Sequence, residues 1–89
     1  MSKNAKVKGE NVKELTFDVK DLNLDERVEF NNIVSIRGSL EKMLFGDYVK
    51  MIRIATNLTD EQINDFTDVE IGLVGWKCYE VVNKKKLKK

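Results

Sequence analysis

Side chains able to do acid–base or metal chemistry fall into two acidic groups. Asp25 and Glu29 are four residues apart and would share one face of a helix. The second group contains Asp60, Glu61, Asp65 and Asp68. Carboxylates so grouped can hold Mg²⁺ or act as an acid–base pair. Asp25, Asp60 and Asp68, however, lie at expected helix starts, where capping and the helix dipole already explain them. We therefore predict no metal site and no catalytic pair.

Nucleophiles and nitrogen or sulfur metal ligands are scarce. The chain has no histidine and one cysteine. A histidine-based triad is therefore excluded, and Cys78 alone cannot supply a zinc site. Cys78 lies among apolar residues of an expected helix, which predicts a buried, unreactive thiol. The sequence contains no set of acid, base and nucleophile residues at the spacing of a catalytic motif. We therefore predict that the protein is not an enzyme and needs no cofactor.

Two glycines form a GxxG pattern, Gly72-Leu73-Val74-Gly75. It matches the nucleic-acid-binding KH loop in form, but that loop needs basic residues where this segment is aliphatic. The pattern also lies inside an apolar helical repeat. We therefore predict that Gly72 and Gly75 are small residues that let another helix approach closely. The glycine-rich phosphate-binding motifs GxxxxGK[ST] and GxGxxG do not occur in the sequence.

Charge is distributed unevenly along the chain. The net charge is +1, but residues 21–82 carry twelve acidic and six basic side chains. The last residues are strongly basic: Lys84, Lys85, Lys86, Lys88 and Lys89. These lysines either bind nucleic acid through its phosphates or serve as a solubilising terminus. Nucleic-acid binding remains an alternative function, because the acidic body would repel phosphates.

Length and composition indicate one small domain. We expect a disordered N-terminus over residues 1–6, a globular domain over 7–83 and a frayed or disordered basic tail over 84–89. Since no apolar run is long enough to cross a bilayer and the N-terminus lacks the apolar core of a signal peptide, we expect a cytoplasmic protein without a membrane partner.

The stretch over residues 67–83 is predicted to be a central helix. Thr67 is a good N-cap, and Glu70 three residues later completes a capping box. One apolar line is spaced for a single helical face: Val69, Leu73 and Trp76. A second line covers the adjacent face: Ile71, Val74, Cys78 and Val81. Two apolar faces predict a helix that is packed on more than one side.

The N-terminal third is predicted to form a hairpin. Gly, Glu and Asn between Val7 and Val12 indicate a turn, and the alternation of Leu15, Phe17 and Val19 with polar residues predicts a half-buried strand. Together with the helical segments, this predicts an α+β, mainly α class: a short hairpin packed on three to four helices.

Cap signals divide the middle of the chain into helices. Asn23 with Glu26 begins the first, which ends or bends at Gly38. Its inward residues are expected at helical spacing: Phe30, Ile33, Ile36, Leu40 and Met43. Gly46 is predicted to terminate it, and Asp47 to cap a second helix ending near Thr56. Thr59 with Gln62 is expected to cap a short third helix, with Ile63 and Phe66 turned inward.

Aromatic and sulfur-containing side chains on the last two long helices are candidates for contact with a partner. They are Tyr48, Met51, Trp76 and Tyr79. Trp76 and Tyr79 are three residues apart and can be neighbours on one edge of a helix. For Trp76, core packing is favoured over an interface role.

Four segments, taken in chain order, resemble a known family. They are Leu15-Thr16-Phe17 at the end of the hairpin, the helix start over residues 21–27, the stretch over residues 48–63 with its Asn-Leu-Thr-Asp-Glu-Gln-Ile cap, and residues 67–71 ahead of a lysine-rich end. This order resembles the small tail assembly chaperones of tailed bacteriophages. The resemblance implies a protein that is not an enzyme and that coats the helical tape measure protein while tail-tube subunits assemble.

The sequence thus predicts a non-enzymatic assembly factor that binds apolar helical segments of another protein, such as a phage tape measure or tail protein, in the host cytoplasm, with a homo-oligomer as one possible state. The alternatives are a small nucleic-acid-associated regulator that uses the lysine run, and a phage virion structural protein.

Overall fold

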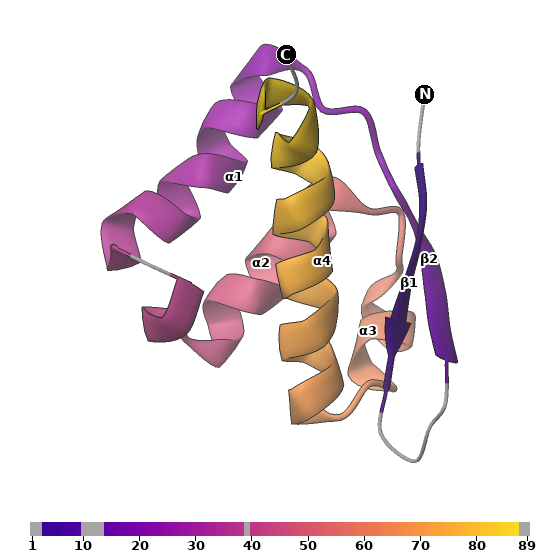
Figure 1. Ribbon diagram of the computed structural model, residues 1–89. Coiled ribbons are helices and arrows are strands. Elements are labelled where there is room, and N and C mark those ends of the chain that lie inside the picture. The colour runs from indigo at the N-terminus through magenta and orange to yellow at the C-terminus, as the bar shows by residue number, and fades with distance from the viewer. Residues whose placement is uncertain (1–2, 10–13, 39, 88–89) are drawn as a thin grey trace.

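The computed structural model describes residues 3–9, 14–38 and 40–87. A hairpin of β1 (Lys3–Lys8) and β2 (Glu14–Val19) precedes the helices (Figure 1). These are α1 (Leu24–Arg37), a 3₁₀ turn η2 (Leu40–Lys42), α2 (Phe45–Ala55), α3 (Asp60–Asn64) and α4 (Asp68–Leu87). The predicted class, mainly helical with an N-terminal hairpin, is confirmed.

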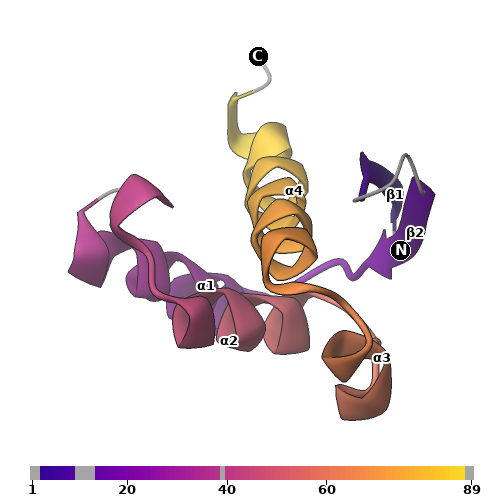
Figure 2. The same ribbon diagram turned by 90° about the horizontal axis from the view of Figure 1, so that it is seen from below.

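Helix α4 is the central element of the fold, as the sequence predicts. It packs on α2 and, on another side, on β1, while α1 lies against α2. Seen from below, α1 and α2 form a layer under α4, and the hairpin stands to its right (Figure 2). The start of β1 and the end of α4 lie at one end of the molecule, and α3 and the start of α4 lie toward the other (Figure 1).

The hairpin is antiparallel, with Ala5 opposite Phe17 and Val7 opposite Leu15. The predicted alternation in β2 is confirmed, since Leu15, Phe17 and Val19 are all buried. The prediction of disorder over residues 1–6 is wrong for residues 3–6, which belong to β1. Pairing with β2 places Ala5 against the core and leaves the lysines outside, so a segment that is mostly polar still forms a strand. Most of the predicted turn, residues 10–13, lies outside the described residues.

The core lies where α4 meets α2 and the hairpin. Its largest fully buried side chains come from the hairpin, α1, α2 and α4: Phe30, Met51, Ile52, Ile71, Val19, Val74 and Cys78. The inward positions predicted for Met51, Ile52 and Ala55 are confirmed, as is the burial of Ile63.

Helix α1 begins and ends where its sequence signals predict. The Glu26 N–H donates to Asn23 Oδ1 over 2.8 Å, and the Asn23 N–H donates to Glu26 Oε1 over 3.1 Å. The helix ends at Gly38, which has a φ of 90°. The inward position expected for Ile36 is wrong, since this side chain is 78% exposed. Six residues at about 100° each place Ile36 roughly a third of a turn away from the buried Phe30.

The start of α2 differs from the prediction. Gly46 lies in the first turn of the helix, and Leu44 is the N-cap. Asp47 still caps the helix, because its carboxylate accepts a hydrogen bond of 3.0 Å from the Leu44 N–H. The Arg37 Nε donates to the same carboxylate oxygen over 2.7 Å, which ties the end of α1 to the start of α2. These hydrogen bonds, with that of Arg37 first, hold the pKa of Asp47 below its ordinary value of 3.8.

Replacing Asp47 with asparagine should lower the free energy of unfolding at neutral pH by about 1 kcal/mol, since a capping and charge-assisted acceptor is weakened. A depressed folded-state pKa stabilises the fold above the unfolded value and loses that stabilisation as the pH falls below about 3.8. The wild type and Asp47→Asn should therefore converge in urea titrations repeated at acid pH. Asp25→Asn, an exposed first-turn control, should cost only a few tenths of a kcal/mol. Equal losses in the two variants would contradict the capping role.

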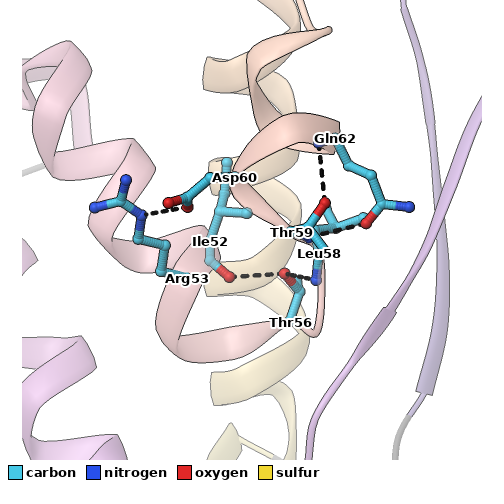
Figure 3. Close-up of polar contacts among 7 residues, drawn as sticks. All are labelled: Ile52, Arg53, Thr56, Leu58, Thr59, Asp60 and Gln62. Atoms are coloured by element: carbon cyan, nitrogen blue, oxygen red, sulfur yellow. Dashed lines mark hydrogen bonds and ion pairs between the residues drawn. The ribbon is translucent and has the colours of Figure 1, made fainter.

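The junction of α2 and α3 is held by side-chain hydrogen bonds (Figure 3). Thr56 Oγ1 donates to the Ile52 carbonyl over 2.7 Å and accepts the Leu58 N–H over 3.2 Å. The predicted capping box of Thr59 and Gln62 is confirmed by reciprocal hydrogen bonds of 3.2 and 2.9 Å. Val19 bridges to Thr56, so this junction also meets the end of β2.

Helix α4 has its predicted start and a later end. Thr67 and Glu70 form the capping box, with hydrogen bonds of 2.9 and 3.2 Å. The backbone is helical through Leu87, whereas the sequence predicts a frayed or disordered tail from residue 84. In the part of the chain that the structure describes, no helix is both long and apolar enough to cross a bilayer.

Candidate partner-binding surface

One face of α4 is apolar and uncovered. Val69 is 56% exposed, Leu73 38% and Trp76 48%. At about 100° per residue these three side chains lie within roughly 60° of one another around the helix, opposite Ile71, Val74 and Cys78. We call Val69, Leu73 and Trp76 the outer stripe.

The two apolar faces predicted for α4 therefore differ in burial. The face with Ile71, Val74 and Cys78 is buried against α2 and the hairpin, as predicted. The outer stripe stays partly exposed, because α2 and the hairpin, which make the most contacts with α4, cover the opposite face. Core packing, the role favoured for Trp76 by sequence, is wrong for this reason.

The four predicted contact residues do not form one surface. Met51 is fully buried and cannot contact a partner in this fold, so that assignment is wrong. Tyr48 and Tyr79 are half-buried. The ring of Tyr79 stacks on Phe30, with centroids 6.4 Å apart. Among the four, Trp76 alone is exposed. The sequence groups these residues by helical spacing, and that spacing does not show which side of each helix is covered.

Gly75 of α4 lies close to Tyr48 of α2. A Cβ placed there would lie 2.5 Å from Tyr48 Cδ1 and 3.2 Å from Tyr48 Cβ. The predicted role as a small residue at a helix contact is confirmed for Gly75. It is wrong for Gly72, whose Cβ position has no atom within 4 Å, because Gly72 lies on the outer side of α4.

An open groove lies beside the first turns of α4. It has a volume of about 530 Å³ and lies between α2, α3 and the first turn of α4. Its apolar part includes Phe45, Val49 and Phe66. Phe45 is 53% exposed. The sequence does not predict Phe45 as a contact residue, because the glycine at position 46 indicates a break between helices. On α4 the groove is lined by Asp68 and Ile71, and Ile71 lies on the face opposite the outer stripe.

Carboxylates surround this groove without forming a metal site. Asp60, Glu61 and Asp68 line it, and Asp60 accepts a hydrogen bond of 3.0 Å from Arg53 Nε (Figure 3). Among the described residues, no three Asp, Glu, Cys or His side chains are grouped so that they could hold a metal ion. The acidic residues therefore contribute mainly negative charge to the rim.

Cys78 is a buried hydrophobic residue, as predicted. Burial raises the pKa of its thiol from 9.0 to about 12. The thiolate is the nucleophile, so the folded protein should hardly react with iodoacetamide at about pH 8 and should react quickly in urea.

The raised pKa of Cys78 also predicts a loss of stability at high pH. The neutral thiol contributes fully below pH 9.0, and the contribution is lost as the pH rises toward about 12. The slope is at most about 1.4 kcal/mol per pH unit. Urea titrations of the wild type and of Cys78→Ala over this pH range measure it. A variant that loses stability as steeply as the wild type would contradict this prediction.

For the lysine run, the structure describes the backbone of residues 84–87 alone. The backbone of Lys84, Lys85 and Lys86 continues α4, while Lys88 and Lys89 lie outside the described residues. The run therefore begins on a helix, at the opposite end of α4 from the groove (Figure 1).

Comparison of the chain with protein-family models, with curated proteins and with solved structures finds no match.

Proposed function

We propose that the protein is a non-enzymatic assembly factor that binds an apolar helical segment of another protein on the outer stripe of α4. The observation that carries this proposal is the exposure of Val69, Leu73 and Trp76 along two turns of one helix. A partner helix presents apolar residues at the same i, i+4, i+7 spacing, so the two stripes can pack along their length.

The energetics favour a partner over solvent. Covering the exposed parts of these three side chains would remove roughly 250 Å² of apolar surface from water, equivalent to about 6 kcal/mol. Association costs of about 4 kcal/mol or more consume much of that gain. A stable complex therefore also needs contacts beyond the stripe, and the groove between α2, α3 and the start of α4 offers further apolar surface from Phe45, Val49 and Phe66.

The charge around the groove selects the partner. Asp60, Glu61 and Asp68 give its rim a negative charge that the single guanidinium of Arg53 only partly offsets. An apolar helix flanked by Lys or Arg is complementary to this rim, and an acidic helix is repelled. Because the chain resembles phage tail assembly chaperones, we propose a helical segment of a tape measure or other tail protein as the natural partner.

A synthetic peptide tests the binding mode. The probe is an amphipathic helix with leucines at helical spacing on one face and lysines on the other. Trp76 is the only tryptophan, so its fluorescence reports directly on the stripe. We expect a saturable shift of its emission to shorter wavelength. A scrambled peptide of the same composition should give none, and a version with glutamates in place of lysines should bind more weakly.

A matched pair of variants locates the site. Leu73→Asp should weaken peptide binding at least about tenfold, because it places a charge at the centre of the stripe. Val28→Asp introduces the same charge at an apolar residue of α1 that is 52% exposed, and should bind normally. Equal losses in both variants would refute the proposal. The proposal would also be refuted if sedimentation showed a stable dimer whose Trp76 emission does not change when the peptide is added.

A further inference from the structure

A small polar cavity lies at the end of the molecule opposite α3. Its volume is about 50 Å³. Its charged residues are Lys3 from β1, Lys20 and Asp21 from the β2–α1 connection, and Arg27 from α1. Val81 and Val82 of α4 form part of its apolar wall. The cavity shares no residue with the outer stripe or the groove, so it can be tested separately from the proposed function.

Arg27, one of the lining residues of this cavity, carries one donor without a partner. Its Nε is buried, and it has no hydrogen-bond partner within the described part of the chain. A buried donor without an acceptor is costly, and native structures keep few of them. An acceptor that enters the cavity and reaches this nitrogen would satisfy the donor.

The charge of the lining indicates which acceptor fits. Lys3, Lys20 and Arg27 carry three positive charges against the single carboxylate of Asp21, which has an interaction of its own. The net charge of about +2 matches that of a phosphate monoester near pH 7, which is about −1.5 to −2. Helix α1 begins two residues after Leu22, and the positive end of its dipole also favours an anion there.

We propose that this cavity binds a phosphate group, with Arg27 Nε as the buried donor and Lys3 and Lys20 as charge partners. The group belongs either to a small phosphate monoester or to a nucleic acid. In both cases the rest of the ligand would lie outside the cavity, near the helical turn of residues 84–87 that follows Val81 and Val82.

The side-chain Nε–H signal of Arg27 in a ¹⁵N–¹H NMR spectrum reads out this contact directly. Titration with inorganic phosphate at constant ionic strength should shift it saturably, together with the amides of Lys20 and Asp21. Arg27→Lys keeps the charge but removes the Nε donor, and should weaken binding at least about tenfold, as judged from those amides. Arg53→Lys, at an exposed arginine paired with Asp60, is the matched control and should bind normally.

The source of the phosphate is distinguished by two further ligands. Tighter binding of a nucleoside monophosphate than of an oligonucleotide lacking terminal phosphates assigns the site to small monoesters. Comparable binding of that oligonucleotide, lost in Arg27→Lys, assigns it to a nucleic-acid backbone. A signal that responds equally to chloride, or an Arg27→Lys variant that binds phosphate as the wild type does, overturns the proposal.

Discussion

Replacing Phe30 with alanine is expected to lower the free energy of unfolding by about 3–5 kcal/mol, the largest loss predicted for this chain. Phe30 is the one buried residue of α1, whose fourteen residues are all described, and none of its surface is exposed. Its ring also stacks on Tyr79 of α4. Removing the ring therefore leaves a cavity at the point where α1 meets the core.

Chemical unfolding measures this loss. For a small domain with a total stability of about 5–15 kcal/mol, the midpoint in urea should fall steeply, as followed by circular dichroism. Val28→Ala truncates an exposed residue two positions earlier in α1 and should stay within about 0.5 kcal/mol of the wild type. If the two variants unfold at the same urea concentration, α1 is not anchored by Phe30.

Replacing Gly75 with alanine is expected to destabilise the protein by about 1–2 kcal/mol. The new Cβ would lie 2.5 Å from Tyr48 Cδ1 and 3.2 Å from Tyr48 Cβ, so the ring and the base of its side chain must move. Overpacking of this kind costs about 1–3 kcal/mol, and the better helix propensity of alanine offsets up to about 1 kcal/mol of it.

Gly72→Ala is the matched control, three residues earlier in the same helix. Its Cβ would meet no atom within 4 Å, so only helix propensity acts, and stability should rise by about 0.5–1 kcal/mol. The sign of the change therefore separates the two glycines. Truncating the facing side chain with Tyr48→Ala should reduce the cost of Gly75→Ala in a double-mutant cycle. A stabilising Gly75→Ala would mean that α2 and α4 are not in close contact at this point.

Local signals in the sequence predicted the start of most elements. The capping boxes at Asn23, Thr59 and Thr67 all form, because each needs only a polar side chain and a residue three positions later. The alternation in β2 was also sufficient to predict which side chains are buried. The start of α2 was predicted less well. Gly46 is tolerated in its first turn because Asp47, one residue later, satisfies the amide of Leu44.

The candidate surface depended on information that is not local. Periodicity identified two apolar lines on α4 but could not show that only one of them has elements packed against it. It likewise grouped the buried Met51 with the exposed Trp76. The cavity at Arg27 joins residues from both ends of the chain, and no spacing along the sequence predicts it.

The sequence by itself determined the mainly helical class, the caps, the two apolar lines of α4 and the buried line of β2, because hydrogen bonding and periodicity act over a few residues. Only the tertiary structure decided which apolar face stays uncovered, which glycine meets α2 and where the charged side chains of distant segments converge. These outcomes depend on which elements pack together, and an apolar side chain has the same sequence signature whether its neighbour is the core or water.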